Sequence, residues 1–164
     1  MATVISGSTG IDKVADGAAM PEGSVLQVVT AIDQTQRNTS STSYTTAGNT
    51  LTVDITPIST SSKILVLVSV IGGHSLGGGK VGYFTIFRGS TDLGSSAGNG
   101  NGMSQNYGGS SDVRTSMNMN VLDSPSTTSQ ITYQVYIKDD GSSGQVDIGW
   151  NNCKGTITAM EIGG

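Results

Sequence analysis

The longest apolar run of the chain spans residues 64–71 and is rich in β-branched side chains. Successive side chains of a strand point to opposite faces, and here both faces are apolar. Ile64 begins the even face, and Leu65, Leu67 and Ile71 lie on the odd face. The run is far too short to cross a membrane as a helix. The pattern predicts a strand covered on both faces, the second face by another part of the chain or by another copy of it.

Seven further segments alternate apolar and polar residues and are bounded by turn residues, as strands are. They span residues 24–32, 51–57, 81–88, 113–122, 131–137, 146–150 and 157–162. Residues 34–46 and 89–111 are polar and are expected to be loops. No segment has helical spacing over two turns. The pattern predicts an all-β antiparallel β-sandwich, with an eight-stranded jelly roll as the leading topology and an immunoglobulin-like sandwich as the alternative.

Residues 1–22 differ from the remainder, because their apolar side chains are isolated. The anchors are Val4, Ile5, Ile11 and Val14. Such a segment buries too little apolar surface to fold alone. We therefore expect two parts: an N-terminal arm over residues 1–22, and a β-sandwich domain over residues 23–164. The arm is either a disordered tail or an extended segment that docks its anchors on a partner.

Composition excludes several classes of partner. Charged residues make up 12% of the chain and the net charge is -4, with no basic stripe or polybasic segment. Binding to nucleic acid or to an anionic membrane is therefore not expected. Cys153 is the single cysteine, so an intrachain disulfide framework is excluded. The first residues lack the features of a secretory signal, which predicts a protein made and folded in the cytoplasm.

The only histidine, His74, lies in a glycine-rich stretch over residues 72–80. The stretch does not have the spacing of a phosphate-binding loop, and no helix is expected after it. A histidine that acts as a base or binds a metal needs partners that hold it, and the neighbouring sequence supplies none. We expect His74 to be a solvated or interfacial loop residue.

The carboxylates are scattered along the chain. Asp139 and Asp140 form the only adjacent acidic pair, and their turn sequence explains them. A weak calcium site there, at Asp92 or at Asp112 is the less favoured interpretation. No nucleophile stands beside a base. The sequence predicts a protein that is not an enzyme and that holds no cofactor and no metal.

Several segments resemble a module found at the ends of bacteriophage fibre proteins. The most specific is Leu-Asp-Ser-Pro-Ser-Thr-Thr at residues 122–128, followed by Thr-Tyr at 132–133. Thr-Pro at 56–57 with Ser-Ser-Lys-Ile-Leu-Val at 61–66 is nearly as specific. The other similar segments are residues 23–30, 86–91, 131–135 and 157–162, and residues 9–14 resemble the joining segment upstream of such modules.

This resemblance implies a virion structural protein of a tailed phage, from an aquatic or cyanobacterial host. It also implies a homotrimer with a tumour-necrosis-factor-like jelly roll, assembled in the host cytoplasm. Only about 22 residues precede the module, and 22 extended residues reach at most ~75 Å. We therefore expect a capsid decoration or cement protein, or a short head fibre. It would be anchored on the major capsid protein, or on another virion protein, through residues 1–22.

Within the expected trimer, either the even face fills the sandwich and Leu65, Leu67 and Ile71 face the three-fold axis, or the two faces are exchanged. The alternative function is a tail-fibre or receptor-binding tip that recognises a host surface glycan. Such a tip needs aromatic side chains on loops, and the expected loops offer Tyr44 and Tyr107, whereas Trp150 is expected on a strand. A depolymerase is a further alternative, but the paired carboxylates that it needs are not evident.

Overall fold

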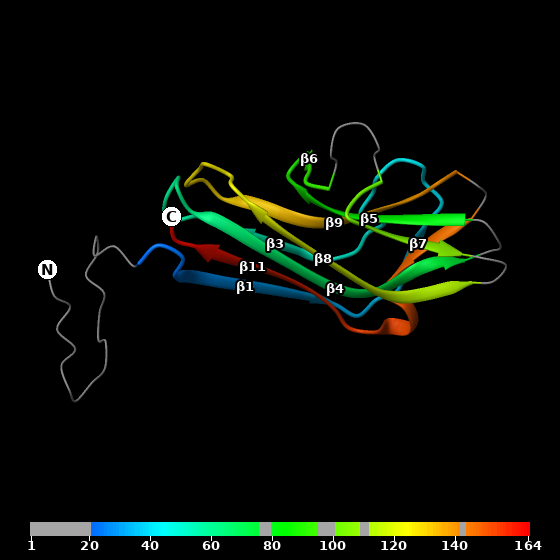
Figure 1. Ribbon diagram of the computed structural model, residues 1–164. Helices are drawn as coiled ribbons and strands as arrows, with labels where there is room; N and C mark the ends of the chain where they lie inside the picture. The colour runs from blue at the N-terminus through cyan, green and yellow to red at the C-terminus, as the bar shows by residue number, and fades with distance from the viewer. Residues whose placement is uncertain (1–20, 76–79, 95–100, 109–111, 142–143) are drawn as a thin grey trace, which may run out of the picture.

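The computed structural model describes residues 21–75, 80–94, 101–108, 112–141 and 144–164, which form two antiparallel sheets packed face to face (Figure 1). The strands are β1 (Val25–Asp33), β2 (Arg37–Thr39), β3 (Thr52–Ile55), β4 (Lys63–Ser75), β5 (Lys80–Arg88), β6 (Thr91–Asp92), β7 (Ser104–Gly108), β8 (Val113–Asp123), β9 (Ile131–Asp139), β10 (Gln145–Ile148) and β11 (Gly155–Ile162). Within these ranges, no helix is long and apolar enough to span a membrane.

The strand order is that of a jelly roll. In the first sheet, sheet A, the order is β1-β11-β4-β10-β2, and β8 pairs with the other edge of β4. In the second, sheet B, the order is β3-β9-β5-β6, and β7 also pairs with β5. The long strands pair from the outside inwards: β1 with β11, β3 with β9, β4 with β8, and β5 with β7. This nesting confirms the predicted antiparallel jelly-roll sandwich.

The core lies between the sheets, where each long strand sends one parity of its side chains. The even positions of β4 are buried, as their alternation predicts: Ile64, Val66, Val68 and Val70. The other strands of both sheets, with Leu51 just before β3, add the other large core side chains, which are Leu51, Val53, Ile55, Phe84, Ile86, Met117, Met119, Tyr133, Val135, Ile137, Val146, Ile148 and Ile157. The core side chains of β4 are therefore covered by this chain alone.

Two of the expected loops contain strands. Residues 34–46 include β2, and residues 89–111 include β6 and β7. β7 has the sequence Ser-Gln-Asn-Tyr-Gly, and only Asn106 and Gly108 are buried in it. Among the described strands β7 pairs with β5 alone, at the edge of the sheet, so it needs little apolar surface of its own. Alternation of apolar residues could not predict it, and Tyr107 lies on a strand and not on a loop.

The segment predicted to end at Trp150 ends as a strand at Ile148. Gly149 takes a left-handed conformation with φ of 70°, which interrupts the extended chain. Trp150 then begins a short 3₁₀ turn, Trp150–Asn152. The expectation that Trp150 lies on a strand was therefore wrong.

β4 continues through the two glycines that were expected to end it. Gly73 pairs with Arg114 of β8 and with Asp147 of β10. A Cβ atom on Gly73 would lie 2.0 Å from the carbonyl oxygen of Val113, so only glycine permits this approach of the strands. The glycines extend the strand to Ser75 and bring His74 into it.

His74 is a buried core residue, which corrects its prediction as a solvated or interfacial loop residue. Its Nε2 atom lies 2.8 Å from Oδ1 of Asp139, and the two side chains are 0% and 2% exposed. Asp139 is the last residue of β9, and its other carboxylate oxygen accepts the N–H of Gly141 at 2.9 Å. A turn sequence alone therefore does not explain the acidic pair, because Asp139 joins β4 of sheet A to β9 of sheet B.

Candidate functional site

The outer face of sheet A carries the predicted interface residues. Leu65, Leu67 and Ile71 occupy odd positions of β4 and point away from the core. Leu67 is 38% exposed, and Leu65 and Ile71 are half-buried. In the part of the chain that the structure describes, no second layer covers this face, although both faces of the strand are apolar.

Strand pairing extends this apolar surface into a row across four strands. Val28 of β1 pairs with Met160 of β11, Met160 pairs with Leu65 of β4, and Leu65 pairs with Leu122 of β8. The ends of the row are the more exposed, with Val28 at 52% and Leu122 at 55%. Directly opposite side chains on neighbouring strands are in reach of one another. The four side chains therefore form one continuous apolar strip.

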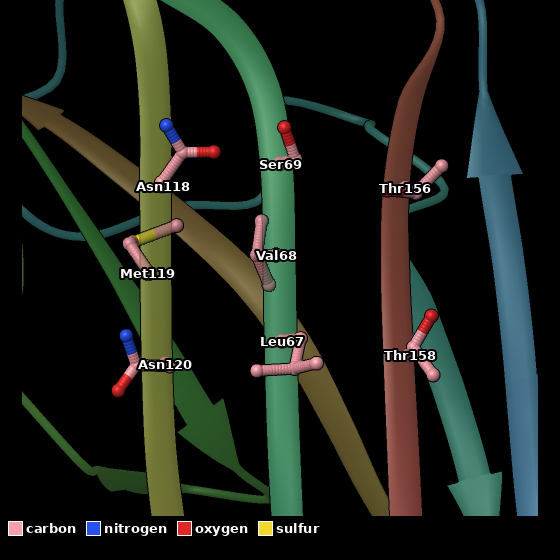
Figure 2. Close-up of a pocket in the computed structure, with 8 residues that line it drawn as sticks. All are labelled: Leu67, Val68, Ser69, Asn118, Met119, Asn120, Thr156 and Thr158. Carbon is pink, nitrogen blue, oxygen red and sulfur yellow. The ribbon is translucent and has the colours of Figure 1, made fainter.

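The next rows are small and polar around Leu67. Figure 2 looks onto this part of the face, where β8, β4 and β11 lie side by side and Leu67 lies between Asn120 and Thr158. A shallow hollow there is lined by Leu67, Val68, Ser69, Asn118, Met119, Asn120, Thr156 and Thr158. The hollow brings together no carboxylate, histidine or cysteine, so it offers no acid–base or metal chemistry.

Charged residues are confined to the margins of this face. The outward side chains between the margins are all uncharged: Val28, Thr30, Ile32, Leu65, Leu67, Ser69, Ile71, Ser116, Asn118, Asn120, Leu122, Thr156, Thr158 and Met160. Lys63 bounds one end and Arg114 the other. We refer to the fourteen uncharged residues between Lys63 and Arg114 as the uncharged face. Depletion of charge with exposed aliphatic side chains is typical of the core of a protein–protein interface.

The Arg114 margin is rigid. Its guanidinium group contacts Asp147 at 2.7 Å and Asp112 at 2.9 Å, and it lies 3.7 Å from the centre of the Trp150 ring. Burial alone would lower the pKa of Arg114, but the hydrogen bonds and charges of Asp112 and Asp147 outweigh burial and raise that pKa. Arg114 is therefore a fixed cation at the end of the uncharged face.

Sequence reasoning identified the centre of the uncharged face and missed its ends. Val28, Met160 and Leu122 lie on the outer parity of strands whose inner parity is also apolar. Their common row depends on the register between strands, which single-strand alternation does not reveal. The usable signal was that Val28 and Leu122 each stand next to an apolar residue of opposite parity, Val29 and Val121.

The four predicted docking residues of the arm, Val4, Ile5, Ile11 and Val14, lie outside the described residues. The described chain begins with a turn in which the N–H of Ser24 donates to the carbonyl oxygen of Pro21 at 3.0 Å. Gly23 then donates its N–H to the carbonyl oxygen of Gly163 at 2.8 Å. The arm therefore joins the sandwich at the end where β11 finishes (Figure 1).

The carboxylates considered as calcium ligands are separated and bound to protein groups. Asp92 accepts the hydroxyl of Thr85 at 2.6 Å, and Asp112 pairs with Arg114. Asp140 accepts the N–H of Val81 at 3.0 Å. Among the described residues, no group of three or more His, Cys, Asp or Glu side chains could hold a metal ion.

Comparison with known proteins finds similarity to solved structures of virus particles, at low identity. No protein-family model and no curated protein matches this chain. Among solved structures, T=1 particles derived from infectious bursal virus match 84% of this chain at 17% identity and a TM-score of 0.46. The VP2 subviral particle of infectious bursal disease virus matches at 18% identity and 0.42, and the Gx strain of that virus at 16% and 0.42. The chain spans 36–38% of the length of these proteins, and the jelly-roll assignment rests on its own strand order.

Proposed function

We propose that this chain is a structural protein of a bacteriophage particle, and that it acts as a homotrimer whose subunits meet through the uncharged face of sheet A. The observation that supports self-association is the composition of this face, which exposes aliphatic side chains and holds no charge between Lys63 and Arg114. The sequence resemblance to fibre-end modules supports the placement on a phage particle.

Magnitudes indicate which side chains drive the association. Complete burial of a large aliphatic side chain contributes about 1.5–3 kcal/mol. Leu67 is only 38% exposed in one subunit, so its further burial adds about 1 kcal/mol at most. Leu122 and Val28 are 55% and 52% exposed, so their burial at an interface contributes a comparable or larger free energy. Leu65, Leu67 and Ile71 are therefore the centre of an interface that also needs the ends of the apolar row.

The proposed particle role is decoration or cementing of the capsid, or that of a short head fibre, within the virion after assembly in the host cytoplasm. Residues 1–22 would dock on the major capsid protein, or on another virion protein, through Val4, Ile5, Ile11 and Val14. Three arms held by one trimer raise the effective affinity by avidity, so each arm can bind weakly. This role requires no catalysis, cofactor, nucleic acid or membrane.

Light scattering coupled to size-exclusion chromatography tests the self-association. We expect the intact protein to be a trimer, and Leu67→Asp to be monomeric or aggregated, because a carboxylate cannot be buried unpaired at an interface. Gln105→Asp is the matched control, since Gln105 is exposed on the outer face of sheet B. A trimer of normal stability in Leu67→Asp would contradict the proposed interface.

Removal of residues 1–22 tests the attachment. We expect the truncated protein to remain a folded trimer, as circular dichroism and light scattering would show, but to be absent from purified phage particles. Incorporation of the truncated protein at the normal level would contradict docking by the arm, and would leave the trimer itself unaffected.

A further inference from the structure

Aromatic side chains gather on the outer face of sheet B, opposite the uncharged face. Four of the five tyrosines of the chain contribute, so the distribution is strongly one-sided. The members are Tyr44, Tyr83, Phe87, Tyr107 and Tyr136, with the ammonium group of Lys138 among them. We refer to these six residues as the tyrosine face. None of them takes part in the proposed trimer contact.

One half of the tyrosine face is a packed base. Phe87 and Tyr136 lie with ring centres 4.2 Å apart, and Tyr44 meets the edge of Phe87 at 5.8 Å. The segment that carries Tyr44 is fixed to β9 by two backbone hydrogen bonds between Thr45 and Ile137, at 3.0 and 2.9 Å. These contacts hold the rings in place, so a ligand would meet a preformed surface.

The other half is accessible. Tyr107 of β7 is 62% exposed, and Tyr83 of β5 is half-buried. Tyr83 pairs with Gln105 in β7, so Tyr107 is its diagonal neighbour on the same face, at about 7–8 Å, within reach of aromatic side chains. Tyr83 also pairs with Lys138 of β9. Two tyrosine rings and one ammonium group therefore lie side by side on three adjacent strands.

Lys138 is a cation held by aromatic rings and not by a carboxylate. Its ammonium nitrogen lies 4.6 Å from the ring centre of Tyr44 and 5.1 Å from that of Tyr83. Among the described residues it forms no ion pair. The carboxylates nearest in sequence and register are already bound: Asp139 by His74, Asp140 by the N–H of Val81, and Asp92 by the hydroxyl of Thr85. The tyrosine face therefore presents a half-buried positive charge that an anionic ligand can pair with.

We propose that the tyrosine face binds an acidic saccharide. The apolar face of a sugar ring stacks on Tyr83 and Tyr107, which offer large rigid surfaces with hydroxyl groups at their edges. The carboxylate of the sugar pairs with the ammonium group of Lys138. Charge complementarity selects an acidic sugar over a neutral one. This site does not depend on the trimer, because it uses the opposite sheet.

Titration of the full-length protein with tetragalacturonate and tetramannuronate tests this inference, with maltotetraose as the neutral probe. Saturation-transfer difference NMR at low salt detects contact, and calorimetry gives the Kd. We expect at least one acidic tetramer to bind and maltotetraose not to bind. Lys138→Gln should raise the Kd about tenfold, as expected for loss of a charge-assisted contact. Tyr83→Ala and Tyr107→Ala should raise it by a similar factor.

Lys154→Gln is the matched control, because Lys154 is exposed in the segment before β11, away from the tyrosine face. It should leave the Kd unchanged, whereas Lys138→Arg keeps the charge and should retain binding. Thermal unfolding of each variant verifies that it is folded. Absence of contact with both acidic tetramers, equal binding of maltotetraose, or an unchanged Kd in folded Lys138→Gln would each overturn the proposal. None of these outcomes would affect the trimer.

Discussion

The buried carboxylate of Glu161 accepts the backbone N–H of Ile58 at 2.7 Å, although the side chain of Ile58 is 68% exposed. Glu161 itself is fully buried at the end of β11. Its other oxygen accepts the side-chain amide of Gln27 on β1. One carboxylate therefore joins the segment before β4 to both β1 and β11, at the end of the sandwich where the described chain begins.

Glu161 has a pKa below its ordinary value of 4.5. Burial acts to raise the pKa, but the hydrogen bonds that the carboxylate accepts from the side chain of Gln27 and the backbone N–H of Ile58 outweigh burial. We expect Glu161→Gln to lose about 1.5–3 kcal/mol of unfolding free energy at pH 7, because hydrogen bonds to a charged acceptor are lost. Urea titration followed by circular dichroism measures this loss.

The difference in unfolding free energy between the intact protein and Glu161→Gln should also depend on pH. A carboxylate with a lowered pKa in the folded state stabilises the fold above its unfolded pKa, and this contribution disappears as the pH falls through the folded value. The difference between the intact protein and Glu161→Gln should therefore be constant near neutrality and shrink below pH 4.5. Asp54→Asn, at an exposed position of β3, is the control with little effect. A difference that stays constant down to pH 3 would contradict this account.

His74 and Asp139 are expected to behave as one unit. Removal of one partner of this buried hydrogen bond leaves the other partner unsatisfied in the interior, which costs about 1–3 kcal/mol, and more where the remaining group is charged. We expect His74→Ala and Asp139→Ala each to destabilise the protein strongly. The double variant should lose less than the two losses added, by about 0.5–3 kcal/mol. Denaturant titration of the four proteins in the cycle measures this coupling.

Two residues that do not contact each other, His74 and Thr158, provide the control for that double-mutant cycle. Thr158 lies on the outer face of sheet A, with no contact to the pair. His74→Ala and Thr158→Ala should therefore add within about 0.5 kcal/mol. Additive losses for His74→Ala and Asp139→Ala would show that the 2.8 Å contact contributes little to stability.

Gly73 is expected to be irreplaceable, because a Cβ atom there would meet backbone. It would lie 2.0 Å from the carbonyl oxygen of Val113 and 2.8 Å from Cα of Arg114. Gly73→Ala should therefore separate β4 from β8 locally and lower the melting temperature by several degrees, or prevent folding. At Gly163 the nearest atoms to a Cβ are 3.6 Å away, so Gly163→Ala should leave the melting temperature nearly unchanged. Equal melting temperatures would contradict the close approach of the strands.

Alternation of apolar residues was sufficient to predict the long strands and the jelly roll, because strand period and burial coincide in them. The even residues of β4 are buried as their pattern indicates, and so are Met117 and Met119 on the odd parity of β8. β7 could not be predicted in this way, since its backbone pairs with β5 while its side chains remain polar. Gly72 and Gly73 had the opposite effect on the prediction. They were expected to end the strand, but they lie inside β4, where they permit close packing of neighbouring strands.

Contacts between distant residues explain the rest of what sequence reasoning missed. His74 and Asp139 are 65 positions apart, and their pairing requires the two sheets to face each other. The tyrosine face joins Tyr44, Tyr83 and Tyr107 from separate segments, so no local pattern indicates it. The centre of the uncharged face was predicted because Leu65 and Leu67 lie in one apolar strand.

The apolar row gives a graded prediction for self-association. Leu65 lies at the centre of the row, between Met160 and Leu122, whereas Val28 lies at its end with one neighbour. A carboxylate at the centre loses more apolar burial and is harder to hydrate at an interface than one at the end. Leu65→Asp should therefore raise the concentration at which the oligomer dissociates more than Val28→Asp does. Sedimentation velocity over a concentration series measures both, with Gln105→Asp as the unaffected reference, and a stronger effect at Val28 would move the centre of the interface to the edge strand β1.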